Sequence, residues 1–195
     1  MNVFRTCLLG LIALPLAAQS TQFSAGGALI VGLDSYKKAV NNSTGFLANV
    51  GWDTTVYKSG IPARLSFGVG LMPGKETNGL KTSLTLLQFS GDILINTDVQ
   101  GLRGVVGLSI NKYSAKFSGA ESPSALDVDH HFPFHDVSGL KGGLRFGFEY
   151  AFTKRIVGDA LIQTTELAGR QRNDALIRKG AVNPGWIQLG ARYQF

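Results

Sequence analysis

The sequence predicts an all-β fold, an eight-stranded antiparallel up-and-down transmembrane β-barrel, and three observations lead to it. Apolar and polar residues alternate along eight segments, which is the pattern of strands with one apolar face. These segments hold about 10 to 13 residues, whereas soluble strands most often hold about 5–6 and a tilted membrane strand needs about 9–11. The connections between the segments alternate between long and short.

The alternation differs in clarity from one segment to the next. It is clearest in the sixth, where Leu144, Phe146 and Phe148 alternate with Arg145 and Glu149, and weakest in the seventh. The predicted strands are residues 23–33, 45–57, 63–72, 83–95, 102–113, 140–152, 157–167 and 186–195.

Strict alternation of loop length places all long loops at one end of the barrel. The predicted long connections are residues 34–44, 73–82, 114–139 and 168–185, and the short ones are 58–62, 96–101 and 153–156. Both chain ends then lie at the short-turn end. Bacterial membrane barrels have this layout, with short periplasmic turns and longer extracellular loops.

A soluble β-sandwich or lipocalin-like barrel is the competing fold, because periodicity does not say which face meets water. Strand length and aromatic placement favour the membrane, since five aromatic residues fall near the periplasmic rim like an interfacial girdle. The rim aromatics are Phe23, Tyr150, Phe152, Tyr193 and Phe195.

Charged residues are 16% of the chain, below the roughly 25% typical of soluble domains. The net charge of +6 does not indicate nucleic-acid binding.

The N-terminal segment has the features of a secretory signal peptide. Arg5 provides a positive charge, an apolar run covers residues 8–16, and small residues follow. We expect cleavage after Ala18, with Ser20 as the alternative, so that residues 1–18 are removed and residues 19–195 form one barrel domain; an uncleaved anchor is the other reading. Cys7, the only cysteine, lies in the removed part, which leaves no disulfide or cysteine-based metal site.

The last ten residues, 186–195, form a strand that closes on an aromatic residue. This strand resembles the assembly signal of bacterial outer-membrane barrels, polar-x-Gly-x-x-aromatic-x-aromatic, and Gln188, Gly190, Tyr193 and Phe195 fill its positions. The resemblance implies the barrel-assembly machinery as a partner.

The whole mature chain resembles the small eight-stranded outer-membrane barrels: the outer-membrane protein X/Ail and opacity-protein group, and the membrane domain of outer-membrane protein A. The resemblance rests on the layout and the C-terminal signal. It implies the bacterial outer membrane as the location, and a structural or surface-binding role, in adhesion or envelope integrity, through the extracellular loops. A narrow solute channel and a lipid A-modifying hydrolase are the alternatives. No enzyme activity and no cofactor are expected.

Eight strands enclose only enough room for side chains, so the polar face is predicted to be a packed interior. Charges removed from water must be paired, and we therefore expect a salt-bridge layer that blocks the lumen near its periplasmic base. The alternative is that water solvates these groups separately. The predicted layer has four acids and three arginines: Asp53, Arg64, Asp92, Arg103, Glu149, Asp159 and Arg192.

The longest loop contains all three histidines, His130, His131 and His135. A metal pair at four-residue spacing needs a helix, which Pro133 opposes, so no metal site is expected. We expect a polar, solvated loop, and a partner contact through the loop's phenylalanines is the other possibility. His135 and Ser138 are spaced His-x-x-Ser, unlike the His-x-Ser-Asn of lipid A deacylases, and no third group orients the histidine, so no catalytic residue is assigned.

The other predicted loops lean basic. At the outer leaflet their cations would meet lipopolysaccharide phosphates, so outer-membrane lipids and lipopolysaccharide are the expected partners, and solvated loop charge is the alternative. Any extracellular ligand is not coded by the pattern. The basic residues are Lys37, Lys38, Lys75, Lys81, Arg170, Arg172, Arg178 and Lys179.

Overall fold

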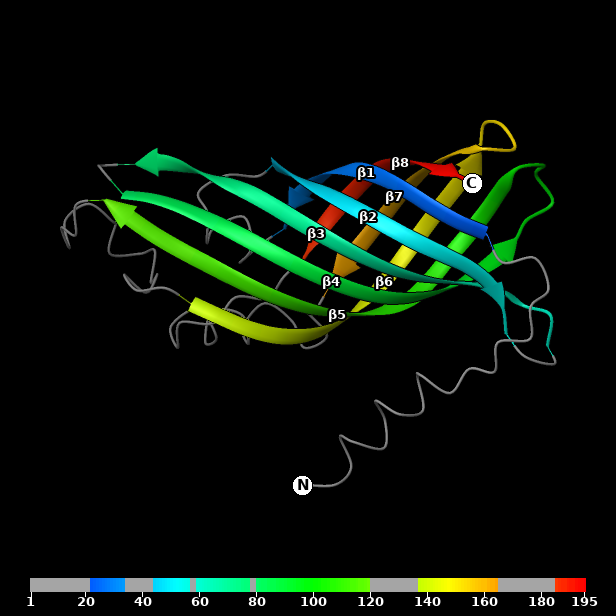
Figure 1. Cartoon of the computed structure of the whole chain (residues 1–195), viewed down its shortest axis with the longest axis horizontal. Helices are drawn as coiled ribbons and strands as arrows, with labels where there is room; N and C mark the ends of the chain where they lie inside the picture. The colour runs from blue at the N-terminus through cyan, green and yellow to red at the C-terminus, as the bar shows by residue number, and fades with distance from the viewer. Residues whose placement is uncertain (1–21, 34–43, 57–58, 78–79, 120–136, 165–184) are drawn as a thin grey trace, which may run out of the picture.

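The computed structural model describes residues 22–33, 44–56, 59–77, 80–119, 137–164 and 185–195. Within them, eight antiparallel strands form one closed barrel in chain order, as Figure 1 shows. This confirms the predicted fold class. No helix in the described ranges is long and apolar enough to cross a membrane. The strands are β1 (Gln22–Gly32), β2 (Thr44–Thr55), β3 (Pro62–Thr77), β4 (Leu80–Asn96), β5 (Leu102–Gly119), β6 (Val137–Ala151), β7 (Ile156–Thr164) and β8 (Trp186–Gln194).

The pairing register fixes the shape of the barrel. When the paired residues are followed from Gln22 of β1 around all eight strands, the path returns to β1 at Gly32, a shift of 32 − 22 = 10 residues. A stagger of this kind requires strands tilted by roughly 35–45° to the barrel axis. Because β1 pairs with both β2 and β8, the sheet has no free edge, as a bilayer demands.

The two faces of the sheet have the distribution expected of a membrane protein. Phe146, Phe148 and Leu189 are 45%, 59% and 56% exposed on the outside, whereas Arg145 and Glu149 are 6% and 2% exposed inside. A soluble barrel would place these two groups the other way round. The soluble alternative is therefore excluded, and the alternation along the strands reports lipid outside and polar groups inside.

The short turns and the chain end cluster at one end of the barrel. Gly60 and Gly101 adopt positive φ angles of 66° and 82° in the β2–β3 and β4–β5 turns, a conformation that favours glycine. The amide of Phe195 donates to the carbonyl of Phe23 over 2.9 Å, which joins the end of the chain to the start of β1. We call this the short-turn end.

Two strands are longer than the sequence predicted. The expected connection 73–82 is mostly strand, because β3 continues to Thr77 and pairs there with Leu80 of β4. Pro73 and Gly74 suggested a break, but the ladder absorbs them at a register shift between Pro73 and Glu76, where such residues are tolerated. Likewise β5 runs to Gly119 and not only to residue 113.

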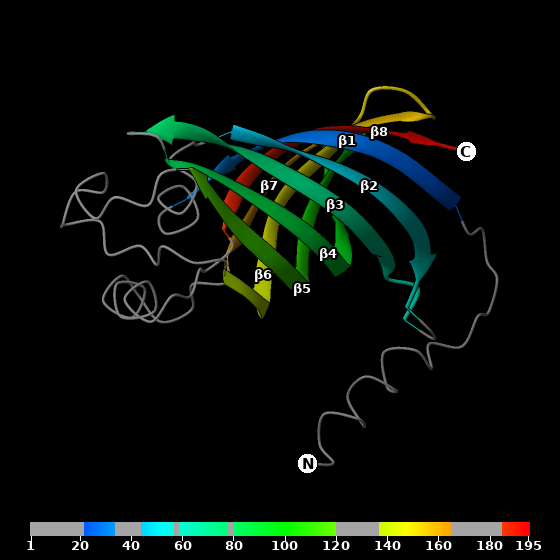
Figure 2. The same cartoon turned by 60° about the vertical axis from the view of Figure 1, so that its left-hand side comes forward.

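The barrel wall is uneven at the end opposite the short turns, which we call the loop end. β3, β4, β5 and β6 hold 16, 17, 18 and 15 residues, against 11, 12, 9 and 9 in β1, β2, β7 and β8. Figures 1 and 2 show β3, β4 and β5 reaching farthest at this end. We call the projecting residues, 73–77, 80–83, 114–119 and 137–143, the raised wall.

Candidate functional site

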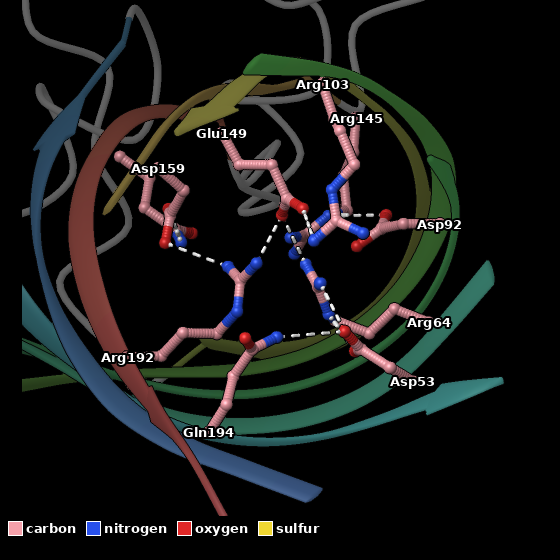
Figure 3. A network of polar contacts seen from close by, with 10 residues as sticks. Asp53, Arg64, Asp92, Arg103, Arg145, Glu149, Asp159, Arg192 and Gln194 are labelled. Atoms are coloured by element: carbon pink, nitrogen blue, oxygen red, sulfur yellow. Dashed lines mark hydrogen bonds and ion pairs between the residues drawn. The ribbon is translucent and has the colours of Figure 1, made fainter. Parts of the chain in front are cut away.

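The short-turn half of the lumen contains a network of ion pairs around one carboxylate (Figure 3). Glu149 of β6 forms ion pairs with three arginines that come from three other strands. Its Oε2 lies 2.7 Å from Nη1 of Arg64 and also pairs with Nη2 of Arg192, and its Oε1 lies 2.5 Å from Nη2 of Arg103. A single carboxylate thus joins β3, β5, β6 and β8 across the lumen.

The remaining acids extend this network to the walls. Asp53 binds Arg64 in bidentate fashion, with Oδ1 to Nε at 2.5 Å and Oδ2 to Nη2 at 2.8 Å. Asp92 lies 3.0 Å from Nε of Arg145. Paired, nearly dry charges of this kind are far more stable than isolated ones.

Amide side chains complete the contacts of two acids. Asp159 lies 3.5 Å from Nη1 of Arg192 and accepts from Nε2 of Gln188 at 2.8 Å. Nε2 of Gln194 donates to Asp53 at 3.3 Å. Both amides come from β8, so the closing strand is fixed to the network at three of its inward positions.

The structure brings all seven predicted lumen charges together, and it adds Arg145, which the sequence interpretation left out. With Arg145 the layer has four acids and four arginines, so its formal charge is zero. Because buried charges must be paired, the predicted excess of one acid over the three arginines indicated that one cation of the layer had been left out. We call these eight residues the ionic layer.

Glycine makes room for the carboxylates. A Cβ at Gly107 would lie 2.1 Å from Oδ1 of Asp92, its neighbour across the β4–β5 pair. A Cβ at Gly190 would lie 2.8 Å from Oδ1 of Asp159. The glycines therefore serve close side-chain packing at these positions.

Polar but uncharged side chains lie next to the ionic layer, toward the loop end. Gln88 donates to Oε1 of Gln163 over 3.2 Å, and Gln163 and Asn111 donate to Oγ of Ser109 over 2.6 and 2.9 Å. All four are buried. This chain of hydrogen bonds, the amide layer, connects β4, β7 and β5.

The loop half of the lumen is apolar, which corrects the expectation of a polar interior throughout. Leu86 and Leu87 are both apolar, so their chemistry does not say which of them faces the lumen. Side chains on a strand alternate between its two faces, and Leu86 is an even number of residues from Gln88 and Asp92, so it lies inside with them. The apolar layer consists of Ala28, Ile30, Leu47, Met72, Leu84, Leu86, Tyr113, Ala115 and Trp186, all buried.

Little space remains within the ionic layer. A cavity of about 20 Å³ lies among Ser24, Arg64, Asp92 and Arg145, which is room for about one water. An open vestibule of about 560 Å³ at the short-turn end has Asp53 and Arg103 in its lining. The arrangement is suited to hold the wall rigid, and it offers solutes no wide aqueous path.

Gln188, Gly190 and Tyr193 of the predicted assembly signal lie on β8, and Phe195 follows directly after it. Tyr193 and Phe195 face outward, 40% and 75% exposed, with their rings 5.3 Å apart, whereas Gln188 is buried against Asp159. Recognition by the assembly machinery stays a prediction. Other rim aromatics also pair: Tyr150 with Phe152 at 5.2 Å and Phe23 with Trp52 at 6.4 Å.

Several predictions lie outside the described residues. They are the signal peptide 1–18, the three histidines, and six of the basic loop residues: Lys37, Lys38, Arg170, Arg172, Arg178 and Lys179. Lys81 is described and exposed on β4, and Ser138 is exposed on β6. In the described part of the chain no group of three His, Cys, Asp or Glu residues could hold a metal.

Solved structures with this fold are small outer-membrane barrels. No protein-family model matches the chain, and no curated protein matches it. The chain is similar to Ail, the attachment invasion locus protein of Yersinia pestis, in complex with the heparin analogue sucrose octasulfate: 15% identity, TM-score 0.52, covering 90% of this chain and 97% of Ail. Neisserial surface protein A matches with 16% identity, TM-score 0.52 and coverage of 90% and 97%. A major outer membrane protein of Thermus thermophilus matches with 15% identity, TM-score 0.50 and coverage of 91% and 100%. At these identities the likeness concerns the fold.

Proposed function

We propose that this chain is an integral protein of the bacterial outer membrane that acts as a closed, non-conducting anchor for a binding surface outside the cell. The observation that carries the proposal is the filled lumen, in which the ionic, amide and apolar layers follow one another along the barrel axis. The role is structural or surface-binding, and we propose no enzymatic activity.

The extracellular end offers the binding surface. The raised wall presents exposed cations outward, among them Lys116, with Lys112 just below it on the same face of β5. Lys112 pairs with Leu87 and Leu140, which face lipid, so its ammonium lies at the upper border of the apolar band. Phosphate groups of lipopolysaccharide lie at that height, and ammonium groups bind them as point charges.

Conductance tests the closed lumen. In planar bilayers the refolded protein is expected to give no discrete current steps at conditions where a porin control does. Regular steps in most insertions would contradict the proposal and favour the narrow channel.

Charge reversal tests the binding surface. We expect Lys112→Glu/Lys116→Glu to weaken binding to lipopolysaccharide vesicles and to reduce its salt dependence, because two cations at the phosphates are replaced. Gln100→Glu, in the β4–β5 turn at the opposite end, is the control and should bind like the unaltered protein. Equal binding by all three proteins would contradict this assignment.

A further inference from the structure

An apolar groove crosses the outer face of β7, β8, β1 and β2. The register places Gly158, Ala191, Gly27 and Ala48 in one row, each facing outward beside the next. The row toward the loop end carries Ala160, Leu189, Leu29 and Phe46, and the row toward the short-turn end carries Ile156, Tyr193, Ala25 and Val50. A row made only of Gly and Ala between two rows that hold mostly large side chains leaves a hollow.

The groove is an open surface hollow of about 870 Å³. Phe148 and Tyr150 of β6 and Phe152 just after it close its side, and the ring of Phe152 lies so near Gly158 that a Cβ there would be 2.7 Å away. Leu29, Phe46, Phe148 and Leu189 are all more than half exposed, so these walls have room for a ligand to pack against them.

The position and rise of the groove keep it within one leaflet of a bilayer. It starts beside the β6–β7 turn and rises to the middle of β1. From Gly158 to Ala48 there are three strand spacings, about 14 Å along the row. Because the strands are tilted by roughly 40°, the row rises only about 9 Å along the barrel axis, which is less than the roughly 15 Å of half the hydrocarbon core. The groove therefore lies in the periplasmic leaflet.

Two cations lie at the foot of the groove, in the turn between β6 and β7. Lys154 and Arg155 are both exposed there. Arg155 lies beside the row just below the groove, because its Nη1 donates to the hydroxyl of Tyr193 over 2.9 Å and its guanidinium lies 6.0 Å from the centre of that ring. The Tyr193 hydroxyl accepts from one of the five N–H groups of Arg155, and this contact holds the guanidinium at the boundary between lipid and water.

We infer that this groove binds one acyl chain of a periplasmic-leaflet phospholipid, with the lipid phosphate held by Arg155 and Lys154. An acyl chain gains van der Waals contact in a hollow that a flat lipid-facing wall does not provide. Lipopolysaccharide is not the occupant, because the cations lie at the short-turn end. A second copy of the barrel is disfavoured, because a two-fold contact at this groove would oppose two concave surfaces and bring both Arg155 side chains together.

Native mass spectrometry of the barrel released from nanodiscs of phosphatidylethanolamine and phosphatidylglycerol tests the inference. We expect a monomer that retains one phospholipid. Gly27→Ile/Ala191→Ile should lower the retained fraction about tenfold by filling the groove. A Cβ at Gly27 meets nothing closer than 3.8 Å, so the change is tolerated.

Gly142→Ile is the matched control at the loop end of β6, outside the groove, where a Cβ meets nothing closer than 3.9 Å. It should retain lipid as the unaltered protein does, and the heat-dependent shift in electrophoretic mobility should show that every variant is folded. Retention that is absent, or equal in filled and control variants, would overturn the inference. A dimer that disappears when the groove is filled would also overturn it, in favour of the second copy.

The headgroup contact has its own variant. Lys154→Gln/Arg155→Gln keeps the groove and removes the cations, so lipid retention should fall while an uncharged diacylglycerol is retained as before. Unchanged phospholipid retention by this variant would overturn the assignment of the phosphate to the turn.

Discussion

The two halves of the lumen solve the same packing problem with opposite chemistry. In the short-turn half, eight charged side chains form ion pairs, three of them directly with Glu149, and in the loop half nine apolar side chains pack together, Trp186 and Leu84 among them. Both halves exclude water from an interior only wide enough for side chains. Ion pairs have defined partners and geometry, whereas apolar packing tolerates rearrangement. The comparison suggests that the ionic layer specifies which strands meet, and that the apolar layer adds bulk stability.

Removing the central carboxylate should have the largest effect. Glu149→Gln leaves Arg64, Arg103 and Arg192 near one another without their shared partner, and breaking a buried pair typically costs about 3–5 kcal/mol. We expect a loss at or above the upper end of that range, measured as the urea midpoint of the refolded barrel in bilayers. Asp98→Asn, in an exposed turn, is the control; equal midpoints for the two variants would mean that the ionic layer is not structural.

Truncation in the apolar half should cost somewhat less. Trp186→Ala removes a fully buried side chain, and such changes cost about 3–5 kcal/mol, reduced where neighbours collapse into the space. Unlike Glu149→Gln, it should leave strand register unchanged, which cross-linking of cysteines introduced at the outward pair Leu29 and Leu189 would report. A register change in Trp186→Ala alone would reverse the roles assigned to the two halves.

A charge pair replaced as a unit should cost less still. Asp92→Leu alone leaves Arg145 without its carboxylate and should destabilise the barrel by about 3 kcal/mol, and Arg145→Met alone leaves Asp92 unpaired. The double variant Asp92→Leu/Arg145→Met should recover most of that loss, because apolar replacements of buried pairs are often neutral. A double-mutant cycle in urea gives the coupling free energy. Simple additivity of the two single changes would show that the pair is not energetically coupled.

The amide layer at the boundary should contribute least. Ser109→Ala removes the oxygen to which Gln163 and Asn111 donate, and unsatisfied buried groups cost about 1–3 kcal/mol. The same urea series measures it. A cost as large as that of Glu149→Gln would mean that the boundary, and not the ionic layer, fixes the barrel.

The sequence identified the strands well, because the alternation in β6 and the length of each segment are local properties. It also identified most of the charges, since parity alone puts Asp53, Asp92 and Glu149 inside. Arg145 was not assigned to the ionic layer, because its position along the barrel axis depends on the ten-residue stagger. That stagger is set only when the whole sheet closes. Arg145 shares a register row with Asp92, although the two are far apart in sequence. The raised wall was not predicted, for a local reason. Pro73 and Gly74 are typical of a loop, and only the pairing of β3 with β4 shows that the strands continue beyond them.

The central claim is that one face of the closed sheet contacts hydrocarbon and the other is dry and packed. Neighbouring residues test it most directly, because Leu108 is 65% exposed outward and Ser109 is 4% exposed inward. In a Cys7→Ser background, nitroxide labels on Leu108→Cys and Ser109→Cys would be compared in bilayers by their relaxation with oxygen and with a water-soluble nickel chelate. We expect strong oxygen relaxation at Leu108→Cys and weak relaxation by both reagents at Ser109→Cys. Strong nickel relaxation at Leu108→Cys would contradict the claim.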